Sequence, residues 1–92
     1  MKYILLAVLI LTSLNADLIQ EGRAELVQAH YDEAKILFRK SCDSGNTQGC
    51  LELGAVYYMD HPKNIKEAVK AYKKACDGGS DLGCKYLSII KN

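Results

Sequence analysis

The stretches "CDSGNTQGC" (residues 42–50) and "CDGGSDLGC" (residues 76–84) repeat one cysteine frame at an offset of 34 residues. Both have the form Cys-x7-Cys, and both place a glycine directly before the second cysteine. Four cysteines allow three connectivities. The duplication favours pairing within each frame, Cys42 with Cys50 and Cys76 with Cys84. Each bridge would close a loop of about nine residues and stabilise the fold by roughly 2.5 kcal/mol.

The duplication extends beyond the cysteines. Residues 31–54 superpose on residues 65–88 at the same offset, and the identical pairs are Glu33/Glu67, Ala34/Ala68, Lys40/Lys74, Cys42/Cys76, Asp43/Asp77, Gly45/Gly79, Gly49/Gly83, Cys50/Cys84 and Leu53/Leu87. A period in the mid-thirties is typical of arrays of helix-turn-helix units. The repeat therefore predicts an all-α domain of helical hairpins.

Helical spacing of the apolar residues supports this prediction. From Ile65, the residues Ala68, Val69, Tyr72 and Ala75 recur on one helical face. An equivalent stripe begins at Tyr31. Upstream of it, residues 17 to about 29 are expected to form one more helix, whose apolar residues are Leu18, Ile19, Leu26 and Val27. We expect five helices, arranged as hairpin units over residues 17–45 and 46–79 and a terminal helix over residues 80–91.

The expected helices are separated by cap and turn residues. Asn64 followed by Glu67 predicts an N-cap with a capping box, and Gly78 and Gly79 predict a left-handed helix end. Pro62 excludes a continuous helix between Tyr58 and Ile65. In such a hairpin, each cysteine pair would join the last turn of one helix to the first turn of the next. Gly49, Gly54 and Gly83 would permit close approach of the helices.

Residues 1–16, "MKYILLAVLILTSLNA", have the layout of a secretory signal peptide. Lys2 precedes an apolar run from Tyr3 to Leu11, which is about half the length that a membrane-spanning helix needs. We therefore expect a secreted or periplasmic domain over residues 17–92, with no stable membrane anchor. Export would bring the cysteines into a compartment where thiols pair.

Charge excludes one class of partner. The chain has 12 Lys and Arg against 11 Asp and Glu, and removal of Lys2 with the signal segment leaves the two signs equal. A neutral domain has no electrostatic basis for binding nucleic acid. No metal site or other cofactor is expected either, because the chain lacks C-x-x-C and its two histidines, His30 and His61, stand alone.

These residues resemble the Sel-1-like repeat family, a relative of the tetratricopeptide repeats, and its cysteine-rich bacterial branch, the Helicobacter cysteine-rich proteins. The resemblance spans about residues 31–91. It rests on Leu53, Gly54 and Tyr57 in "CLELGAVYY", on "KEAVKAYKKAC", and on Cys-x7-Cys with its glycine. It implies a right-handed α/α solenoid of about two and a half repeats. The turn "DHPKN" and the first unit, which lacks the cysteines and L-G-x-x-Y, depart from the family pattern.

The resemblance implies two functions. The first is a module whose concave surface binds a peptide or protein partner. Tyr57 and Tyr58 lie on the helix that would line this surface. Tyr57 is the better candidate for the core and Tyr58 for an exposed contact. Poorly covered ends of so short an array also suggest a dimer formed through an end face.

The second function is that of a β-lactamase or penicillin-binding protein, with a β-lactam or peptidoglycan-like ligand, because members of the cysteine-rich branch are catalogued as such. "SIIK" at Ser88–Lys91 matches the S-x-x-K motif of serine β-lactamases. "SGN" at residues 44–46 is not the partner motif S-D-N, and K-T-G is absent. The catalytic motifs are therefore incomplete.

Overall fold

Helices alternate with short turns throughout the part of the chain that the computed structural model describes, residues 17–91. A first helical segment covers residues 17–27, and it is followed by α2 (Tyr31–Asp43), α3 (Thr47–Met59), α4 (Ile65–Asp77) and α5 (Asp81–Lys91). The expected all-α class and the five helices are confirmed for these residues. The predicted signal peptide, residues 1–16, lies outside them.

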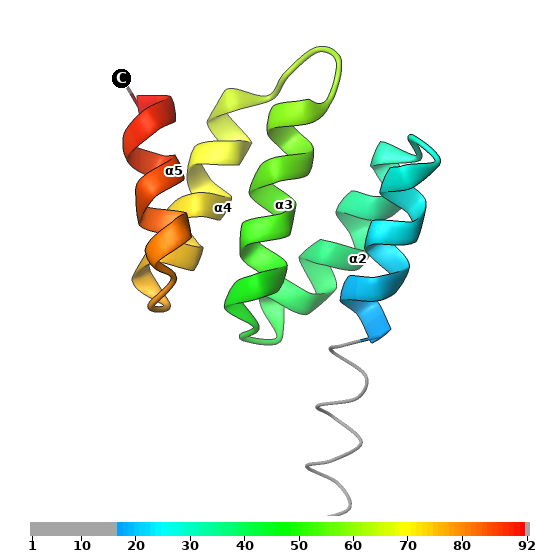
Figure 1. Ribbon diagram of the computed structural model, residues 1–92, viewed down its shortest axis with the longest axis horizontal. Helices are drawn as coiled ribbons and strands as arrows, with labels where there is room; N and C mark the ends of the chain where they lie inside the picture. Colours follow the sequence, from blue (N-terminus) through cyan, green and yellow to red (C-terminus); the bar gives the residue numbers. More distant parts are fainter. Residues whose placement is uncertain (1–16, 92) are drawn as a thin grey trace, which may run out of the picture.

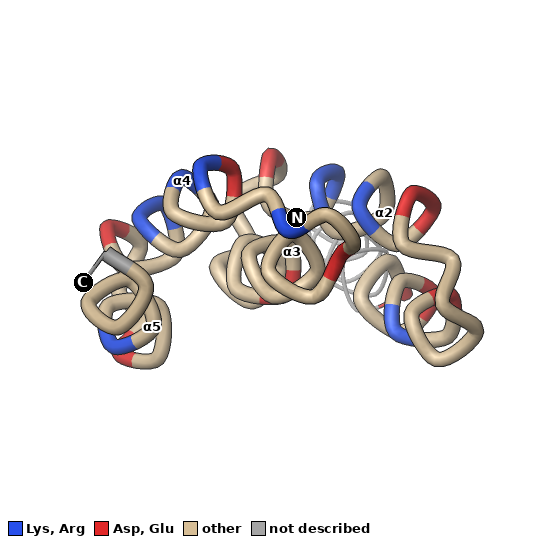
Figure 2. The backbone as a smooth tube through the Cα atoms, turned by 90° about the horizontal axis from the view of Figure 1, so that it is seen from above, with Lys and Arg blue, Asp and Glu red and all other residues tan. Residues whose placement is uncertain are grey.

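Successive helices pack against each other as hairpins, α2 on α3, α3 on α4 and α4 on α5. Figures 1 and 2 show two rows: residues 17–27, α3 and α5 form one row, and α2 and α4 form the other. Both rows are bowed in Figure 2, with residues 17–27, α3 and α5 on the inner side. We call this side the inner face and the opposite side the outer face.

Three side chains cap helix N-termini as their residue types predict. Asn46 accepts a hydrogen bond from the backbone N–H of Gln48 (3.0 Å), and Asn64 accepts one from Glu67 (3.2 Å). Ser80 accepts one from the backbone N–H of Gly83 (3.0 Å). Each cap satisfies a backbone donor that has no partner within its own helix.

Two details of the predicted helix ends are wrong. The capping box at Asn64 is half formed, because the backbone N–H of Asn64 donates to the carbonyl of Tyr57 (3.0 Å) and not to Glu67. The five-residue turn folds back on α3 and supplies this nearer acceptor. Gly79 has the expected left-handed conformation (φ +101°), whereas Gly78 keeps a negative φ of −83°. The equivalent turn uses Gly45 (φ +95°).

The core lies between the two rows. It is built from Ile19, Ala34, Phe38, Cys42, Cys50, Leu51, Leu53, Val56, Tyr57, Ala68, Ala71, Tyr72 and Ala75. Val27, one of the apolar residues of the first helical segment, is exposed. It is the last residue of that segment, beyond which the chain turns away.

Both predicted disulfides are present. Cys42 is bonded to Cys50 and Cys76 to Cys84, with Cα atoms 4.5 Å apart in each pair. The glycine before each second cysteine explains how the helices come so close. A Cβ atom added at Gly49 would lie 2.7 Å from the backbone nitrogen of Cys42, and one at Gly83 would lie 2.9 Å from that of Cys76. Any larger residue would push the two helices apart.

Candidate functional site on the inner face

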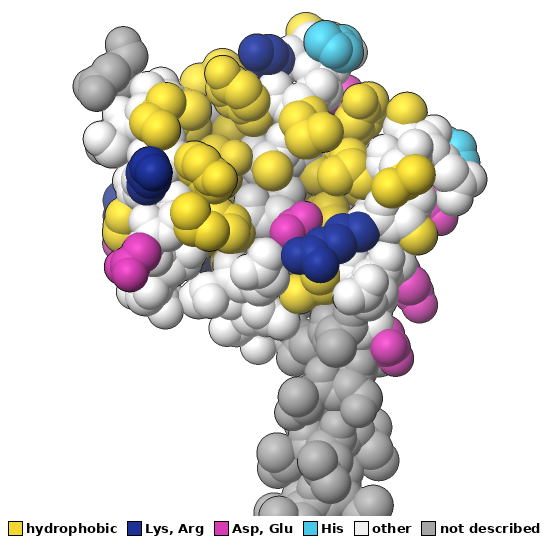
Figure 3. Space-filling view, viewed as in Figure 1, with side chains coloured by type: hydrophobic (Ala, Val, Ile, Leu, Met, Phe, Trp, Pro, Cys, Tyr) yellow, Lys and Arg dark blue, Asp and Glu magenta, His cyan; other side chains and the backbone are white. Residues whose placement is uncertain are grey.

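Exposed apolar side chains gather on the inner face over α3 and α5, where Figure 3 shows hydrophobic groups with charged groups scattered around them. On α5, Leu82, Tyr86 and Ile89 follow the spacing i, i+4, i+7, so they share one side of the helix. All three are exposed, Leu82 by 51% and Ile89 by 60%. We call these three residues the α5 stripe. Monomeric proteins seldom leave such groups together in water unless they contact a partner.

Tyr86 joins the α5 stripe to a group of tyrosines. Its ring lies 5.4 Å from that of Tyr72 in α4, centroid to centroid, at a tilt of 52°. Tyr72 is buried, and burial raises the pKa of its phenol to about 12, with smaller contributions from Tyr86, Tyr58 and Glu52. Tyr58 and Tyr86 are thus close enough to Tyr72 to affect the charge state of its phenol. The three tyrosines form a cluster with apolar ring surfaces and polar rims.

The two adjacent tyrosines of α3 lie in different environments. Tyr58 is 39% exposed, and the Nζ atom of Lys63 lies 4.3 Å from the centre of its ring. This cation–π geometry shows that the ring is open to a positively charged group. Tyr57 is only 9% exposed and points away from the tyrosine cluster. It therefore offers little surface to a partner.

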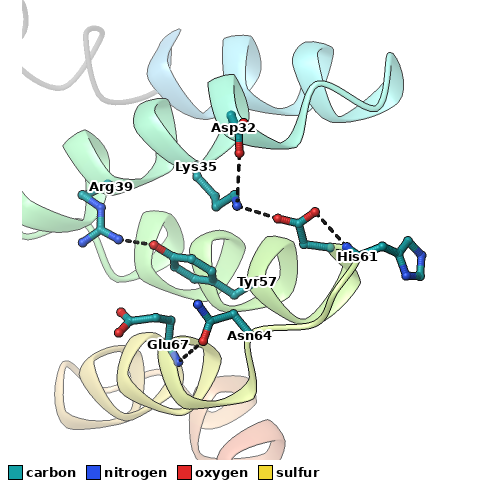
Figure 4. A network of polar contacts seen from close by, with 8 residues as sticks. Asp32, Lys35, Arg39, Tyr57, His61, Asn64 and Glu67 are labelled. Carbon is teal, nitrogen blue, oxygen red and sulfur yellow. Dashed lines mark hydrogen bonds and ion pairs between the residues drawn. The ribbon is translucent and has the colours of Figure 1, made fainter.

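Tyr57 belongs to a polar network on the outer face, which Figure 4 shows from close by. Arg39 of α2 donates a hydrogen bond to its hydroxyl, and the Nζ atom of Lys35 lies 5.3 Å from the ring centre. Lys35 also pairs with Asp60 (2.5 Å). This pairing lowers the pKa of Asp60 and raises that of Lys35. The network ties α2 to the α3–α4 turn and has a structural role.

A groove on the outer face separates α2 from α4, with Leu53 and Tyr57 of α3 at its base. Its volume is about 140 Å³, below the range of roughly 300–1,000 Å³ that is typical of small-molecule sites. Its charged rim is paired internally, Lys70 with Glu67 (3.2 Å) and Lys74 with Asp43 (3.3 Å). The groove is therefore a junction between repeats and a poor candidate for a ligand site.

One ion pair marks the edge of the inner face. Arg23, in the first helical segment, donates to Glu52 of α3 (2.9 Å), and Gln48 donates to the same carboxylate (3.0 Å). The carboxylate raises the pKa of Arg23 through the hydrogen bond and its charge. Glu52 thus places a polar boundary beside the tyrosine cluster.

The candidate catalytic residues lie on α5. Ser88 is exposed, and it does not line the groove between α2 and α4. Lys91 is the last residue of the helix, and its side chain lies outside the described part. Ser88 is the residue of α5 that corresponds to Gly54 of α3, 34 positions earlier. Gly54 is covered by α4, whereas Ser88 is exposed.

Metal binding has no support in residues 17–91, where no cluster of three or more His, Cys, Asp or Glu side chains could hold an ion. The cysteines are taken by the two disulfides, and His30 contacts Glu25 (2.7 Å). Within the same residues, no helix is long and apolar enough to cross a membrane.

Comparisons with known proteins leave the family open. The chain matches no protein-family model. A search of curated proteins likewise found no sequence similar to it. The function of the chain must therefore be inferred from its own residues.

The sequence prediction missed most of the inner-face site, although a signal was present. At the offset of 34 residues, Leu82 replaces Gln48, Tyr86 replaces Glu52 and Ile89 replaces Ala55. Each replacement makes the later repeat more apolar at a position that faces solvent. A comparison of the exposed positions of the two repeats would have found the α5 stripe.

Proposed function

We propose that this protein is an extracytoplasmic repeat module that binds a peptide or protein partner through the inner face of α3 and α5. The observation that carries the proposal is the α5 stripe beside Tyr58 and Tyr72. Clustered aromatic and aliphatic side chains supply most of the affinity at protein interfaces. Tyrosine is suited to this role, because its ring packs against apolar groups while its hydroxyl bonds to polar ones.

Two sets of repeated contacts support a Sel-1-like solenoid as the scaffold. Gly49 meets the end of α2 in the way that Gly83 meets the end of α4. Gly22 packs on Phe38 as Gly54 packs on Tyr72. An array that repeats its helix contacts presents an extended inner surface, which is how helical repeat proteins bind peptides. The disulfides favour an oxidising compartment, such as the periplasm or the exterior of the cell.

The chemistry of the surface defines the class of ligand. The α5 stripe and the tyrosine rings suit a segment with two or three apolar or aromatic side chains. The Arg23–Glu52 pair on one side and Lys63 on the other suit polar or charged flanking residues. We therefore expect a short amphipathic peptide segment, presented by a protein of the same compartment.

A peptide-library selection against the oxidised protein tests the proposal. We expect the selected peptides to be rich in apolar and aromatic residues. The substitutions Leu82→Glu and Tyr58→Ala should each weaken their binding at least about tenfold, which is the usual loss at a central contact. Ile36→Glu is the matched control, because Ile36 is 56% exposed, close to the 51% of Leu82, and lies on α2. Unchanged affinity in both inner-face variants would contradict the proposal.

A further inference from the structure

A second apolar surface lies on α2, away from the inner-face site. Glu33, Ile36, Leu37 and Lys40 follow the spacing i, i+3, i+4, i+7 and so form one stripe along the helix. We call these four residues the α2 stripe. Ile36 is exposed and Leu37 is half-buried. With Glu25, the first three residues of the stripe line a groove of about 250 Å³.

The duplication shows what kind of surface this is. The residues 34 positions later, Glu67, Lys70, Ala71 and Lys74, line the groove between α4 and α2. There, Lys74 pairs with Asp43 across the junction (3.3 Å). The α2 stripe is thus the side by which a repeat contacts the repeat before it. Within residues 17–91, the segment 17–27 is the only helix before α2. It leaves Ile36 of the α2 stripe exposed.

The α2 stripe is more apolar than the equivalent positions of α4, although the α2 stripe is the one that faces solvent. On α4, which faces α2 across the groove, the two middle positions are Lys70 and Ala71. On α2, the equivalent positions are Ile36 and Leu37. Isoleucine and leucine are among the residue types most often buried in folded proteins. The open side of α2 is therefore suited to contact with another apolar surface.

The charges identify the partner. Glu33 and Lys40 lie two helical turns apart, with Ile36 and Leu37 midway between them. Within the described residues, the side chains of Glu33 and Lys40 form no ion pair. A twofold axis through the middle of the stripe places a second α2 antiparallel to the first. Each Glu33 then faces the Lys40 of the other copy, and the apolar residues meet at the centre.

We propose that two copies of this chain form a symmetric dimer through antiparallel packing of their α2 stripes. Such an isologous contact closes after two subunits and leaves no open end for further growth. It lies apart from the α5 stripe and leaves the inner face free in both subunits. The dimer would thus present two ligand sites and could bind a bivalent partner with increased avidity.

Sedimentation velocity of the exported, oxidised protein over a range from about 1 μM to 1 mM tests the dimer. One helix face and its rim bury less than the roughly 1,200–2,000 Å² of a standard interface. We therefore expect a reversible dimer with a dissociation constant in the micromolar range. Ile36→Glu should raise this constant at least about tenfold. Leu82→Glu, of similar exposure but on α5, should leave it unchanged.

Charge reversal tests the symmetry itself. Glu33→Lys leaves two lysines on each stripe, and Lys40→Glu leaves two glutamates, so each variant alone should dimerise about tenfold more weakly. An equimolar mixture should recover the wild-type constant, because every contact across the axis again joins opposite charges. Recovery should fade at high salt, which screens exposed charges.

Three results would overturn the proposal. The first is a monomer at every concentration. The second is a dimer that Ile36→Glu leaves intact. The third is a mixture of the two charge variants that stays monomeric. Peptide affinity, measured with soluble peptide, is independent of all three and tests only the proposed function.

Discussion

Gly54 of α3 lies directly against the ring of Tyr72 in α4. A Cβ atom added at Gly54 would lie 2.7 Å from the Cδ1 and Cε1 atoms of that ring. Gly22 has the same relationship to Phe38, one repeat earlier, at 2.5 Å from Cε1. Each repeat thus packs a glycine of one helix on an aromatic ring of the next. This contact sets the distance between the two rows.

Gly54→Ala should therefore destabilise the protein. An added methyl group must displace the buried ring of Tyr72, and overpacking of this kind costs about 1–3 kcal/mol. The small gain in helix propensity from alanine, about 1 kcal/mol, offsets only part of this cost. Urea unfolding followed by circular dichroism measures the difference. Ser88→Ala, at the equivalent open position of α5, is the control and should change stability by less than about 0.5 kcal/mol.

Ser41→Ala should stabilise the protein. Ser41 is fully buried, and its Oγ atom is the one buried side-chain polar atom without a hydrogen-bond partner in the described part of the chain. Burying an unsatisfied hydroxyl costs about 1–3 kcal/mol. The next repeat has Ala75 at this position, packed against Gly83 as Ser41 packs against Gly49. The reciprocal change, Ala75→Ser, should lower the free energy of unfolding by a similar amount. If Ser41→Ala and Ala75→Ser unfold with equal free energies, this explanation is wrong.

The two disulfides should differ in how readily they are reduced. Cys42 and Cys50 are each only 3% exposed, because α4 and the core cover them. Cys84 lies on the open side of α5 and is exposed. Since thiol–disulfide exchange requires access to a sulfur atom, a limiting amount of dithiothreitol should open Cys76–Cys84 first. Alkylation and peptide mass mapping at successive times measure the order, and simultaneous labelling of all four cysteines would contradict it.

Stability should fall at alkaline pH because of Tyr72. Its pKa is about 12 in the folded protein, against 10.0 for an unperturbed tyrosine. Folding thus favours the neutral phenol, so its contribution is complete below pH 10 and is lost as the pH rises toward 12. A gap of this size corresponds to at most about 3 kcal/mol. Tyr72→Phe should flatten the fall in the free energy of unfolding across this range, while Tyr31→Phe should leave its slope unchanged.

Local sequence predicted the helices well because their ends depend on neighbouring residues. Asn46, Asn64 and Ser80 cap helices through backbone donors two or three residues away. The cysteine pairing followed from the duplication, and both bridges formed as expected. The missing capping-box bond at Asn64 was an error of another kind, since its backbone N–H found an acceptor seven residues back, in Tyr57.

The candidate site was predicted less completely. The sequence points to Tyr58, which is exposed, but it does not point to Tyr72 or Tyr86 as parts of a site. Tyr72 had been placed correctly on the buried face of its helix. That its ring meets the ring of Tyr86 on α5 depends on how the helices pack, and no local pattern encodes this. Gly22 was missed for a related reason, because the shorter first turn changes the offset to its counterpart, Gly54, from 34 to 32 residues.

The amino-acid sequence by itself determined the helices, their caps and the two covalent links, since each depends on residues less than ten positions apart. The sequence also made Tyr57 the better candidate for the core and Tyr58 for an exposed contact, and their exposures of 9% and 39% agree. Only the tertiary structure decided which groups meet them, Arg39 of α2 at the hydroxyl of Tyr57 and Lys63 over the ring of Tyr58. Successive residues on a helix point about 100° apart, and α3 is bordered on several sides by other helices. Which side chains contact each of the two adjacent tyrosines is therefore set by the placement of those neighbouring helices.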